Sequence, residues 1–211
     1  MYQPRAFVET DLAALDAMIA TGPFVTLVSL DDDGLPFASH LPVLYAREGD
    51  RVLIEGHWAR PNPQAGHAGQ VLMIVHGPHA YVSPGVYPDK ETAARVPTWN
   101  YAIAHLRGSL DMFDDETALG DLVDRLSQRF EATVGRDWRF EPGRDDHRSQ
   151  LRGIVGFRFV PDRIDLKFKL SQNHPPANRQ AVRDDLAARY DTGARAVAAL
   201  MRARGPDPHH D

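Results

Sequence analysis

The chain has 211 residues, no cysteine and a formal net charge of −5. The absence of cysteine excludes disulfides, thiolate metal sites, iron–sulfur clusters and a cysteine nucleophile. The acidic balance gives no global field that would attract nucleic acid. No run reaches the roughly 20 apolar residues of a membrane-spanning helix, and the first ten residues lack the pattern of a signal peptide, so we expect a cytoplasmic protein without membrane contact.

The N-terminal quarter predicts a short helix followed by a β-meander. Thr10 is a candidate N-cap for an apolar helical face, and Gly22-Pro23 ends that helix. Pro36 and Pro42 cannot donate to a β-ladder, so the strand that carries them is expected at an edge or a bulge. The three predicted strands span residues 24–30, 35–45 and 51–56.

The rest of the chain predicts further strands with helices between and after them. The expected elements are a loop at 57–69, a strand at 71–82, a loop at 83–96, a strand at 99–113, a helix capped by Asp114 or Asp115 and stopped by Gly135, and strands at 154–160 and 163–170. Residues 163–170 alternate between polar and apolar, which is typical of a half-buried strand. Asn178 is a candidate cap for the first of two helices, at 179–190 and 194–204.

Six or more antiparallel strands with short turns and a few helices indicate a mainly β, α+β fold, an antiparallel β-barrel with helical additions. Closure of the barrel would remove exposed sheet edges. We expect a barrel domain at residues 1–175 with a helical insertion around 115–134, a helical extension at 176–204 and a disordered tail at 205–211.

The segment Pro97–Tyr101 carries two large aromatic residues with a carboxamide between them. In an extended chain, Trp99 and Tyr101 share one face while Asn100 reaches the other. That layout suits a planar heterocyclic ligand, which needs stacking and a few placed polar groups. The alternative is that both aromatics are core residues of a sheet, and this segment alone favours the core interpretation.

Two other segments carry candidate ligand-binding groups. In the loop after the third strand, Arg60 offers a planar fork matched to phosphate and Asn62 a neutral donor; a solvated surface loop is an equal alternative. At the end of the last strand, Lys169 and the following hydroxyl and carboxamides form a cluster that could orient a ligand, although a solvent-facing strand and turn is the simpler interpretation.

No motif for a metal, a phosphate-binding glycine loop or a catalytic triad stands out. His76 and His79 flank Gly77-Pro78, which forbids a helix, and neither a thiolate nor a nearby carboxylate accompanies them. We therefore predict no metal site.

Several segments together resemble the PaiB family, described as FMN-binding negative transcriptional regulators. They follow family order from residue 1 to about residue 185, and the three segments nearest the C-terminus are specific when taken together. The segments are Met1–Arg5 with Phe7, Phe24–Leu30 with Asp33–Pro36, His40–Pro42, His57–Arg60 with Asn62-Pro63, Gly77–Pro84, Val96–Tyr101 and Lys169–Asn173.

The resemblance implies a split β-barrel of the kind shared with pyridoxamine-phosphate oxidases and flavin reductases. It also implies a homodimer with FMN in a groove at the subunit interface. In that fold the loop after the third barrel strand helps to hold the flavin phosphate, while the later segments lie near the ring or close the pocket. The implied cofactor-binding residues are His57, Arg60, Asn62, Tyr81, Ser83, Trp99, Asn100, Tyr101, Lys169, Ser171, Gln172 and Asn173.

The function implied by the resemblance is that of a flavin-dependent redox or regulatory protein. Oxidoreductase activity stays open, because the Arg/Lys phosphate pattern of true pyridoxamine-phosphate oxidases is absent. One alternative is a DNA-binding repressor that acts through the arginine-bearing helices of residues 179–204. Another is a haem-binding split barrel. Its candidate axial ligands are His40, His57, His105 and His174.

Overall fold

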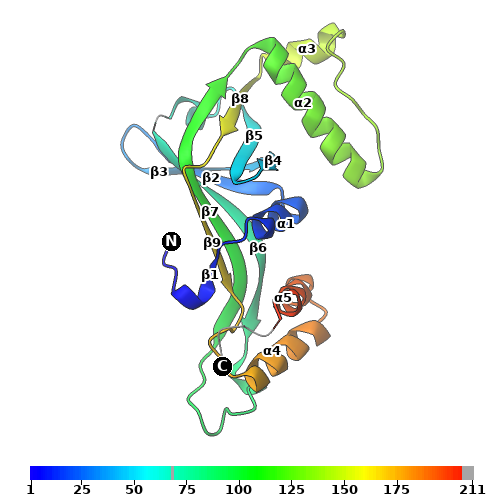
Figure 1. The fold of residues 1–211 in the computed structure, drawn as a ribbon. Coiled ribbons are helices and arrows are strands. Elements are labelled where there is room, and N and C mark those ends of the chain that lie inside the picture. Colours follow the sequence, from blue (N-terminus) through cyan, green and yellow to red (C-terminus); the bar gives the residue numbers. More distant parts are fainter. Residues whose placement is uncertain (68, 206–211) are drawn as a thin grey trace. The chain divides into compact units, whose positions relative to one another are not determined.

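The computed structural model describes residues 1–67 and 69–205, and Figure 1 shows their secondary structure. The chain divides into two compact units. The central unit consists of Leu12–Val75 and His105–Ile164, and the terminal unit of Met1–Asp11, His76–Ala104 and the chain from Asp165 onward. Two long strands, β6 (Gln70–Val82) and β7 (Thr98–Phe113), each carry residues of both units. The domain boundaries expected from the sequence stay a prediction.

The strands follow the order β3-β2-β6-β7-β8-β5-β4, with β9 pairing with β7 and β1. The pairings with a defined register are antiparallel. The central unit contains α1 (Ala13–Thr21), β2 (Phe24–Leu30), β3 (Pro36–Pro42), β4 (Leu44–Glu48), β5 (Arg51–Ala59), the 3-10 helix η2 (Pro63–Gly66), α2 (Glu116–Glu131), the 3-10 helix η4 (Ala132–Val134), α3 (Asp145–Leu151) and β8 (Ile154–Phe159). Because β3 ends this order, its two prolines lie on an edge strand, as predicted.

The single strand expected at residues 35–45 is wrong, because the chain changes partner at Val43. Strand β3 pairs with β2, whereas β4 pairs with β5. At the break, the Val43 N–H donates to the Pro23 carbonyl at 2.9 Å, so this buried residue is satisfied outside either ladder. The expected helix start is also wrong: α1 begins at Ala13 with Leu12 at the N-cap, not Thr10.

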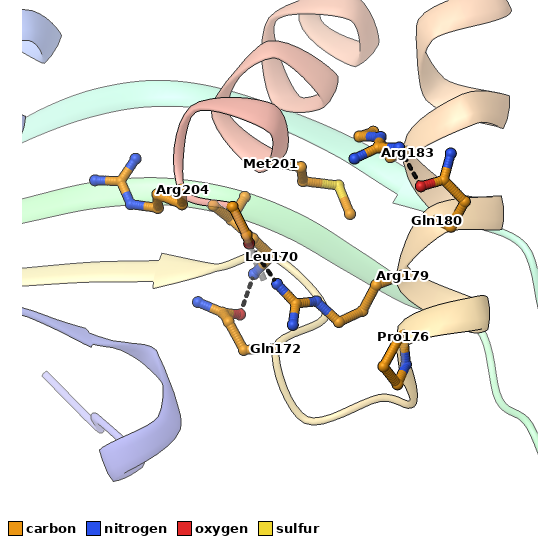
Figure 2. A pocket seen from close by; sticks show the side chains of 9 residues that line it. Leu170, Gln172, Pro176, Arg179, Gln180, Arg183, Met201 and Arg204 are labelled. Atoms are coloured by element: carbon orange, nitrogen blue, oxygen red, sulfur yellow. Dashed lines mark hydrogen bonds between the residues drawn. The ribbon is translucent and has the colours of Figure 1, made fainter. Parts of the chain in front are cut away.

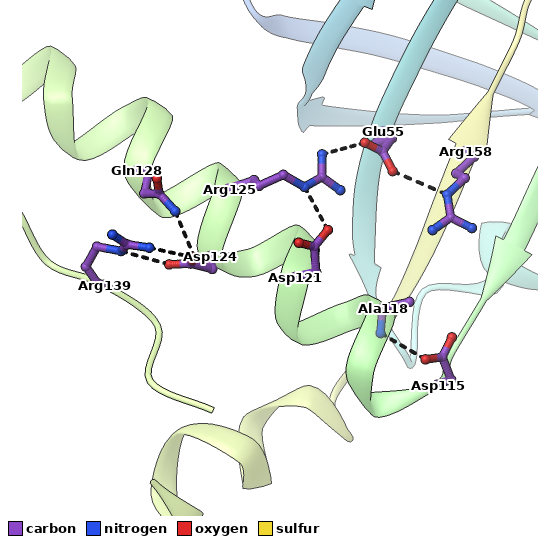
Figure 3. A network of polar contacts seen from close by, with 9 residues as sticks. All are labelled: Glu55, Asp115, Ala118, Asp121, Asp124, Arg125, Gln128, Arg139 and Arg158. Carbon is purple, nitrogen blue, oxygen red and sulfur yellow. Dashed lines mark hydrogen bonds and ion pairs between the residues drawn. The ribbon is translucent and has the colours of Figure 1, made fainter. Parts of the chain in front are cut away.

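Helix α2 begins as the sequence predicts, but the α-helix ends at Glu131, and the 3-10 helix η4 continues to Val134 before Gly135. The Asp115 carboxylate accepts from the Ala118 N–H at 2.9 Å, and Gly135 has a φ of 67°, the left-handed conformation that favours glycine. One side of α2 is tied to the sheet by the buried Glu55 carboxylate, which binds Arg125 of α2 and Arg158 of β8 (Figure 3). The helix thus lies over strands β5 and β8, and β5 leads directly into residues 60–69, which we call the Arg60 loop.

The terminal unit contains the 3-10 helices η1 (Arg5–Phe7) and η3 (Pro84–Val86), β1 (Val8–Glu9), β9 (Arg163–Lys169, of which residues 165–169 belong here), α4 (Pro176–Ala188) and α5 (Thr192–Ala203). The prediction of a half-buried β9 is wrong on its polar face. Asp165 and Lys167 are 6% and 8% exposed. The N-terminal segment covers them: β1 pairs with β9, and the Lys167 ammonium donates to the Tyr2 carbonyl at 3.0 Å.

Asn178 is not the cap of the first C-terminal helix. Helix α4 begins two residues earlier, where Pro176 occupies the first helical position and needs no N–H acceptor. The Asn178 side chain is buried and donates to the Asp89 carboxylate at 2.9 Å. Of the tail predicted to be disordered, residues 206–211 lie outside the described residues. Within the described residues, no helix has the length and apolar character needed to cross a membrane.

Candidate functional site

The predicted site residues fall into two groups, one in each unit. His57, Arg60 and Asn62 belong to the central unit, and the other predicted residues belong to the terminal unit. Each group is described by itself below.

Arg60 follows β5 directly, and its side chain is held by the neighbouring segment. The pairing of β5 with β8 continues into a bond from the Arg60 N–H to the Gly153 carbonyl at 2.7 Å. Its guanidinium donates to the carbonyls of Arg152 and Ile154 at 2.9 and 3.1 Å and contacts the Asp114 carboxylate at 3.3 Å. These bonds use three of the five guanidinium N–H groups, so a fixed, half-exposed fork with two donors remains.

Asn62 is committed to the shape of its own loop. Its carbonyl oxygen accepts from the Gln64 N–H at 3.0 Å, which caps η2, and its amide donates to the Ser39 hydroxyl at 3.0 Å.

His57, unlike Asn62, has a side-chain nitrogen that makes no hydrogen bond to the described residues. Its Nδ1 atom is buried without a hydrogen-bond partner, and burial lowers the pKa of the imidazole below its ordinary value. The imidazole is therefore neutral near pH 7.

The lowered pKa of His57 predicts a loss of stability in mild acid. The unfolded chain binds a proton to this imidazole more readily than the folded chain does, so the stabilisation is complete above about pH 6.5 and falls as the pH drops below that value. We expect His57→Gln to flatten the dependence of unfolding free energy on pH between about 7 and 5, measured by urea denaturation. An unchanged slope in this variant, or an equal flattening in the exposed control His79→Gln, would contradict the assignment.

The sequence did not single out Gln64, which joins this loop to the core. Gln64 is 1% exposed. Its carbonyl oxygen accepts from the Trp58 indole N–H at 3.2 Å, and its amide nitrogen lies within hydrogen-bonding distance of the Leu27 carbonyl, the Phe37 carbonyl and the Ser29 hydroxyl. The only local signal was its place directly after the motif of His57–Arg60 with Asn62-Pro63.

In the terminal unit, the aromatic segment has the alternation predicted from its sequence. Asn100 is fully buried, whereas Trp99 on the opposite face is 51% exposed and Tyr101 is half-buried. Trp99 is thus not a core residue. Its ring forms an exposed cluster with Tyr81 and His79, each with a centroid 6.0 Å away, beside a cavity at the start of α5.

The end of β9 and the start of β7 enclose a cavity of about 200 Å³, which we call the polar pocket. Its lining residues are Ala94, Arg95, Val96, Thr98, Asn100, Lys169, Ser171, Asn173 and His174. Lys169 donates to the Trp99 carbonyl at 2.7 Å and to the Thr98 hydroxyl. Burial, and then repulsion from Lys167, lowers the pKa of Lys169. The structure therefore brings Lys169, Ser171, Asn173 and Asn100 together, as predicted.

Ser171 has a backbone conformation that side-chain-bearing residues rarely adopt. Its φ of 65° turns the chain sharply after β9. Its hydroxyl lies 3.0 and 3.2 Å from the nitrogen and oxygen of the Asn100 carboxamide, so the turn is locked to β7. A non-glycine residue held in this way is found at ligand-binding and catalytic positions more often than elsewhere.

Five predicted residues of the terminal unit do not line the polar pocket: Trp99 and Tyr101, described above, and the three that follow. Gln172 folds back on its own strand, accepting from the Leu170 N–H at 2.7 Å and donating to the Phe168 carbonyl at 2.6 Å. The Ser83 hydroxyl caps η3 through the Gly85 N–H at 3.2 Å. Tyr81 belongs to the exposed aromatic cluster instead.

Two pocket residues were not among the predicted flavin-binding residues: Arg95 was not singled out at all, and His174 was named only as a candidate haem ligand. Arg95 and His174 lie 79 positions apart, yet the Arg95 guanidinium lies 3.3 Å from the His174 Nδ1 atom. Asp89 binds the other side of Arg95, and the Tyr87 ring stacks on His174 at 4.9 Å. Burial, then Arg95 and Lys169, lowers the pKa of His174. No local pattern marks either residue, because only the fold of the 83–96 loop brings them together.

Comparison with known proteins supports both the fold and the ligand expected from the sequence. A family described as "Putative FMN-binding domain" matches residues 1–163. The "Protease synthase and sporulation protein PAI 2" of Bacillus subtilis is 30% identical over 215 residues, covering 95% of this chain and 96% of that protein.

Solved structures at lower identity share the fold. The flavocytochrome Anf3 from Azotobacter vinelandii is 15% identical with a TM-score of 0.54, covering 77% of this chain and 69% of that one. The FAD and heme binding protein from Mycobacterium smegmatis is 20% identical with a TM-score of 0.53, covering 76% and 72%. These likenesses confirm the antiparallel split barrel predicted for this chain.

Proposed function

Because the chain belongs to the PaiB-type family of FMN-binding proteins, we propose that it acts as a homodimer that holds FMN at the subunit interface, as a redox or regulatory protein. The observation that carries this proposal is the family match, which confirms FMN as the expected cofactor and extends over residues 1–163. Bound FMN supplies one-electron or hydride transfer, while the protein supplies position and electrostatics. A cytoplasmic location belongs to the same proposal, since a chain without cysteine suits a reducing compartment.

The polar pocket has the charge that part of a flavin nucleotide needs. Its lining contains the cationic side chains of Lys169 and Arg95 and no carboxylate, while the Asp89 carboxylate binds Arg95 from outside the lining. FMN carries a phosphate, and its ring gains negative charge on reduction, so a lining of this kind favours both groups. At about 200 Å³ the pocket admits only part of the nucleotide, which is in keeping with a shared interface. We assign Lys169 to the flavin ring and Arg60 to the phosphate.

The test of this function is a titration of the purified protein with FMN, followed by flavin absorbance and fluorescence, together with the molecular mass in solution. We expect a shifted flavin spectrum and a dimer. Free-flavin spectra at every protein concentration would refute the binding site, and a monomer that still binds FMN would refute the interface.

Arg60→Ala is expected to weaken FMN binding by about 1–3 kcal/mol, because a charge-assisted contact to the phosphate would be lost. The measurement is the FMN dissociation constant from quenching of flavin fluorescence. Arg51→Ala removes the same charge from an exposed position on the same strand, and we expect it to leave the constant unchanged. Equal constants for the Arg60 variant and the wild type would remove Arg60 from the site.

The DNA-binding alternative gains no support from the C-terminal helices. Arg183, Arg189 and Arg204 each have a carboxylate within 4 Å, from Asp184, Asp185 and Glu9 respectively. Three of the six arginines of residues 179–204 are thus paired, and the DNA-binding alternative stays a prediction. The haem alternative stays a prediction, since likeness to a haem-binding protein shows the fold alone.

A further inference from the structure

A further cavity of the terminal unit is lined by the segment that follows β9, on the side of that segment opposite to the polar pocket. We call it the arginine cavity; its volume is about 250 Å³, and it is bounded by residues of α4, of α5 and of the chain after β9 (Figure 2). The lining residues are Leu170, Gln172, Pro176, Arg179, Gln180, Arg183, Met201, Arg204 and Gly205. It is separate from the polar pocket, with which it shares no lining residue.

The cavity contains one arginine that has no carboxylate partner in the part of the chain that the structure describes. Figure 2 shows Arg179 reaching from α4 toward Leu170, and its guanidinium donates to the Gly205 carbonyl at 2.9 Å. Within residues 1–67 and 69–205, no carboxylate pairs with it. By contrast, Arg204 is bound to Glu9 at 2.8 Å, and Arg183 lies 3.6 Å from Asp184. All three arginines are half-buried.

Part of the remaining wall is apolar, beside the carboxamides of Gln172 and Gln180. Leu170 and Met201 are 3% and 7% exposed, and Pro176 completes this side of the cavity. A planar guanidinium beside an apolar wall matches a carboxylate on a small hydrocarbon body better than it matches a compact, fully hydrated anion such as inorganic phosphate.

We propose that the arginine cavity binds a small amphipathic carboxylate through Arg179, and that its occupancy alters FMN binding on the other side of the shared wall. The second half of this proposal rests on the proposed function. The wall is the segment Lys169–Asn173: Leu170 and Gln172 line the arginine cavity, whereas Lys169, Ser171 and Asn173 line the polar pocket.

A second link joins the two cavities. Met201 lines the arginine cavity, and its sulfur accepts from the Asn100 amide at 3.7 Å. Asn100 in turn lines the polar pocket and bonds to Ser171, the residue in the left-handed conformation. A ligand that packs on Met201 and Leu170 therefore touches the side chain that contacts Asn100 and the residue that precedes Ser171. Such a chain of contacts is a physical route for coupling between two sites.

Binding is tested by isothermal titration of the flavin-free protein with hexanoate and benzoate. The neutral hexanamide and inorganic phosphate serve as comparison ligands. We expect both carboxylates to bind at least tenfold more tightly than the comparison ligands, and Arg179→Ala to lose at least tenfold in affinity. Arg202→Ala, an exposed position on α5, removes the same charge and should change affinity less than twofold.

Two results would overturn the carboxylate site: no measurable binding by either the folded wild type or the folded D207N/D211N variant, or equal binding by Arg179→Ala and the wild type. Because Asp207 and Asp211 follow Gly205 in the sequence, a wild type that binds nothing is retested as the D207N/D211N variant, and silence in both proteins is decisive. Thermal unfolding of each variant establishes that it is folded.

Coupling is tested by measuring the FMN dissociation constant with and without saturating benzoate. We expect a change of threefold or more in the wild type and none in Arg179→Ala. An unchanged constant in the wild type would refute the coupling. If FMN itself fails to bind, the proposed function fails, while the calorimetry with carboxylates still decides the arginine cavity by itself.

Discussion

Replacing Trp58 with alanine is expected to destabilise the protein by about 3–5 kcal/mol, the usual cost of truncating a fully buried aromatic residue. Trp58 is 1% exposed, and its ring lies 4.8 Å from that of Phe157 on the neighbouring strand. The cavity left behind cannot close easily, because Gly56 already lies so near the Phe157 ring that a Cβ there would be 2.7 Å from it. Urea denaturation followed by circular dichroism measures the loss.

Trp138→Ala is the matched control for this change. The Trp138 side chain is 50% exposed and touches only His147 among aromatic rings of the described residues. Its truncation should cost less than about 1 kcal/mol. If the two variants lost similar stability, Trp58 would not be the centre of the central-unit core, and the Arg60 loop two residues further on would need another support.

The elements that a short-range pattern determines were predictable from the sequence. The two-residue period of a strand placed Asn100 and Trp99 on opposite faces, although the favoured interpretation of Trp99 as a core residue is wrong. An aspartate before an amphipathic run marked the start of α2. The resemblance of spaced motifs led to the split barrel and to FMN. In each case the deciding information lies within a few residues, or in the order of several short motifs.

What could not be predicted depends on contacts between distant segments. The alternation of β9 predicts that Lys167 faces solvent, but the first residues of the chain cover it. No residue near β9 in the sequence indicates that contact. The sequence around Arg60 predicts a guanidinium available to a ligand, yet two of its acceptors are backbone carbonyls more than 90 positions away. The partnership of Arg95 with His174 arises in the same way. Long-range closure of this kind has no periodic signature in the chain.

Gln64→Leu is expected to cost about 3 kcal/mol, because it removes the buried hub beneath the Arg60 loop. Leucine fills a similar volume but cannot accept from the Trp58 indole N–H, and it leaves the Ser29 hydroxyl without its amide partner. A buried donor without an acceptor costs about 1–3 kcal/mol, and the other lost bonds add to that. Gln150→Leu, an exposed change of the same type, should be nearly neutral when both are measured by urea denaturation.

A double-mutant cycle separates the hydrogen bond from the packing at this hub. Trp58→Phe removes the indole N–H, so in the Gln64→Leu background it no longer breaks a bond and instead relieves an unpaired donor. We expect the double variant to be more stable than the sum of the single losses by about 1 kcal/mol or more. Strict additivity would mean that the 3.2 Å contact between these side chains contributes nothing to stability. With strict additivity we would also expect the turn at residues 62–64 to keep its shape, because its bond from the Gln64 N–H to the Asn62 side chain is unaffected. The FMN affinity of the Gln64→Leu variant should in that case equal that of the wild type.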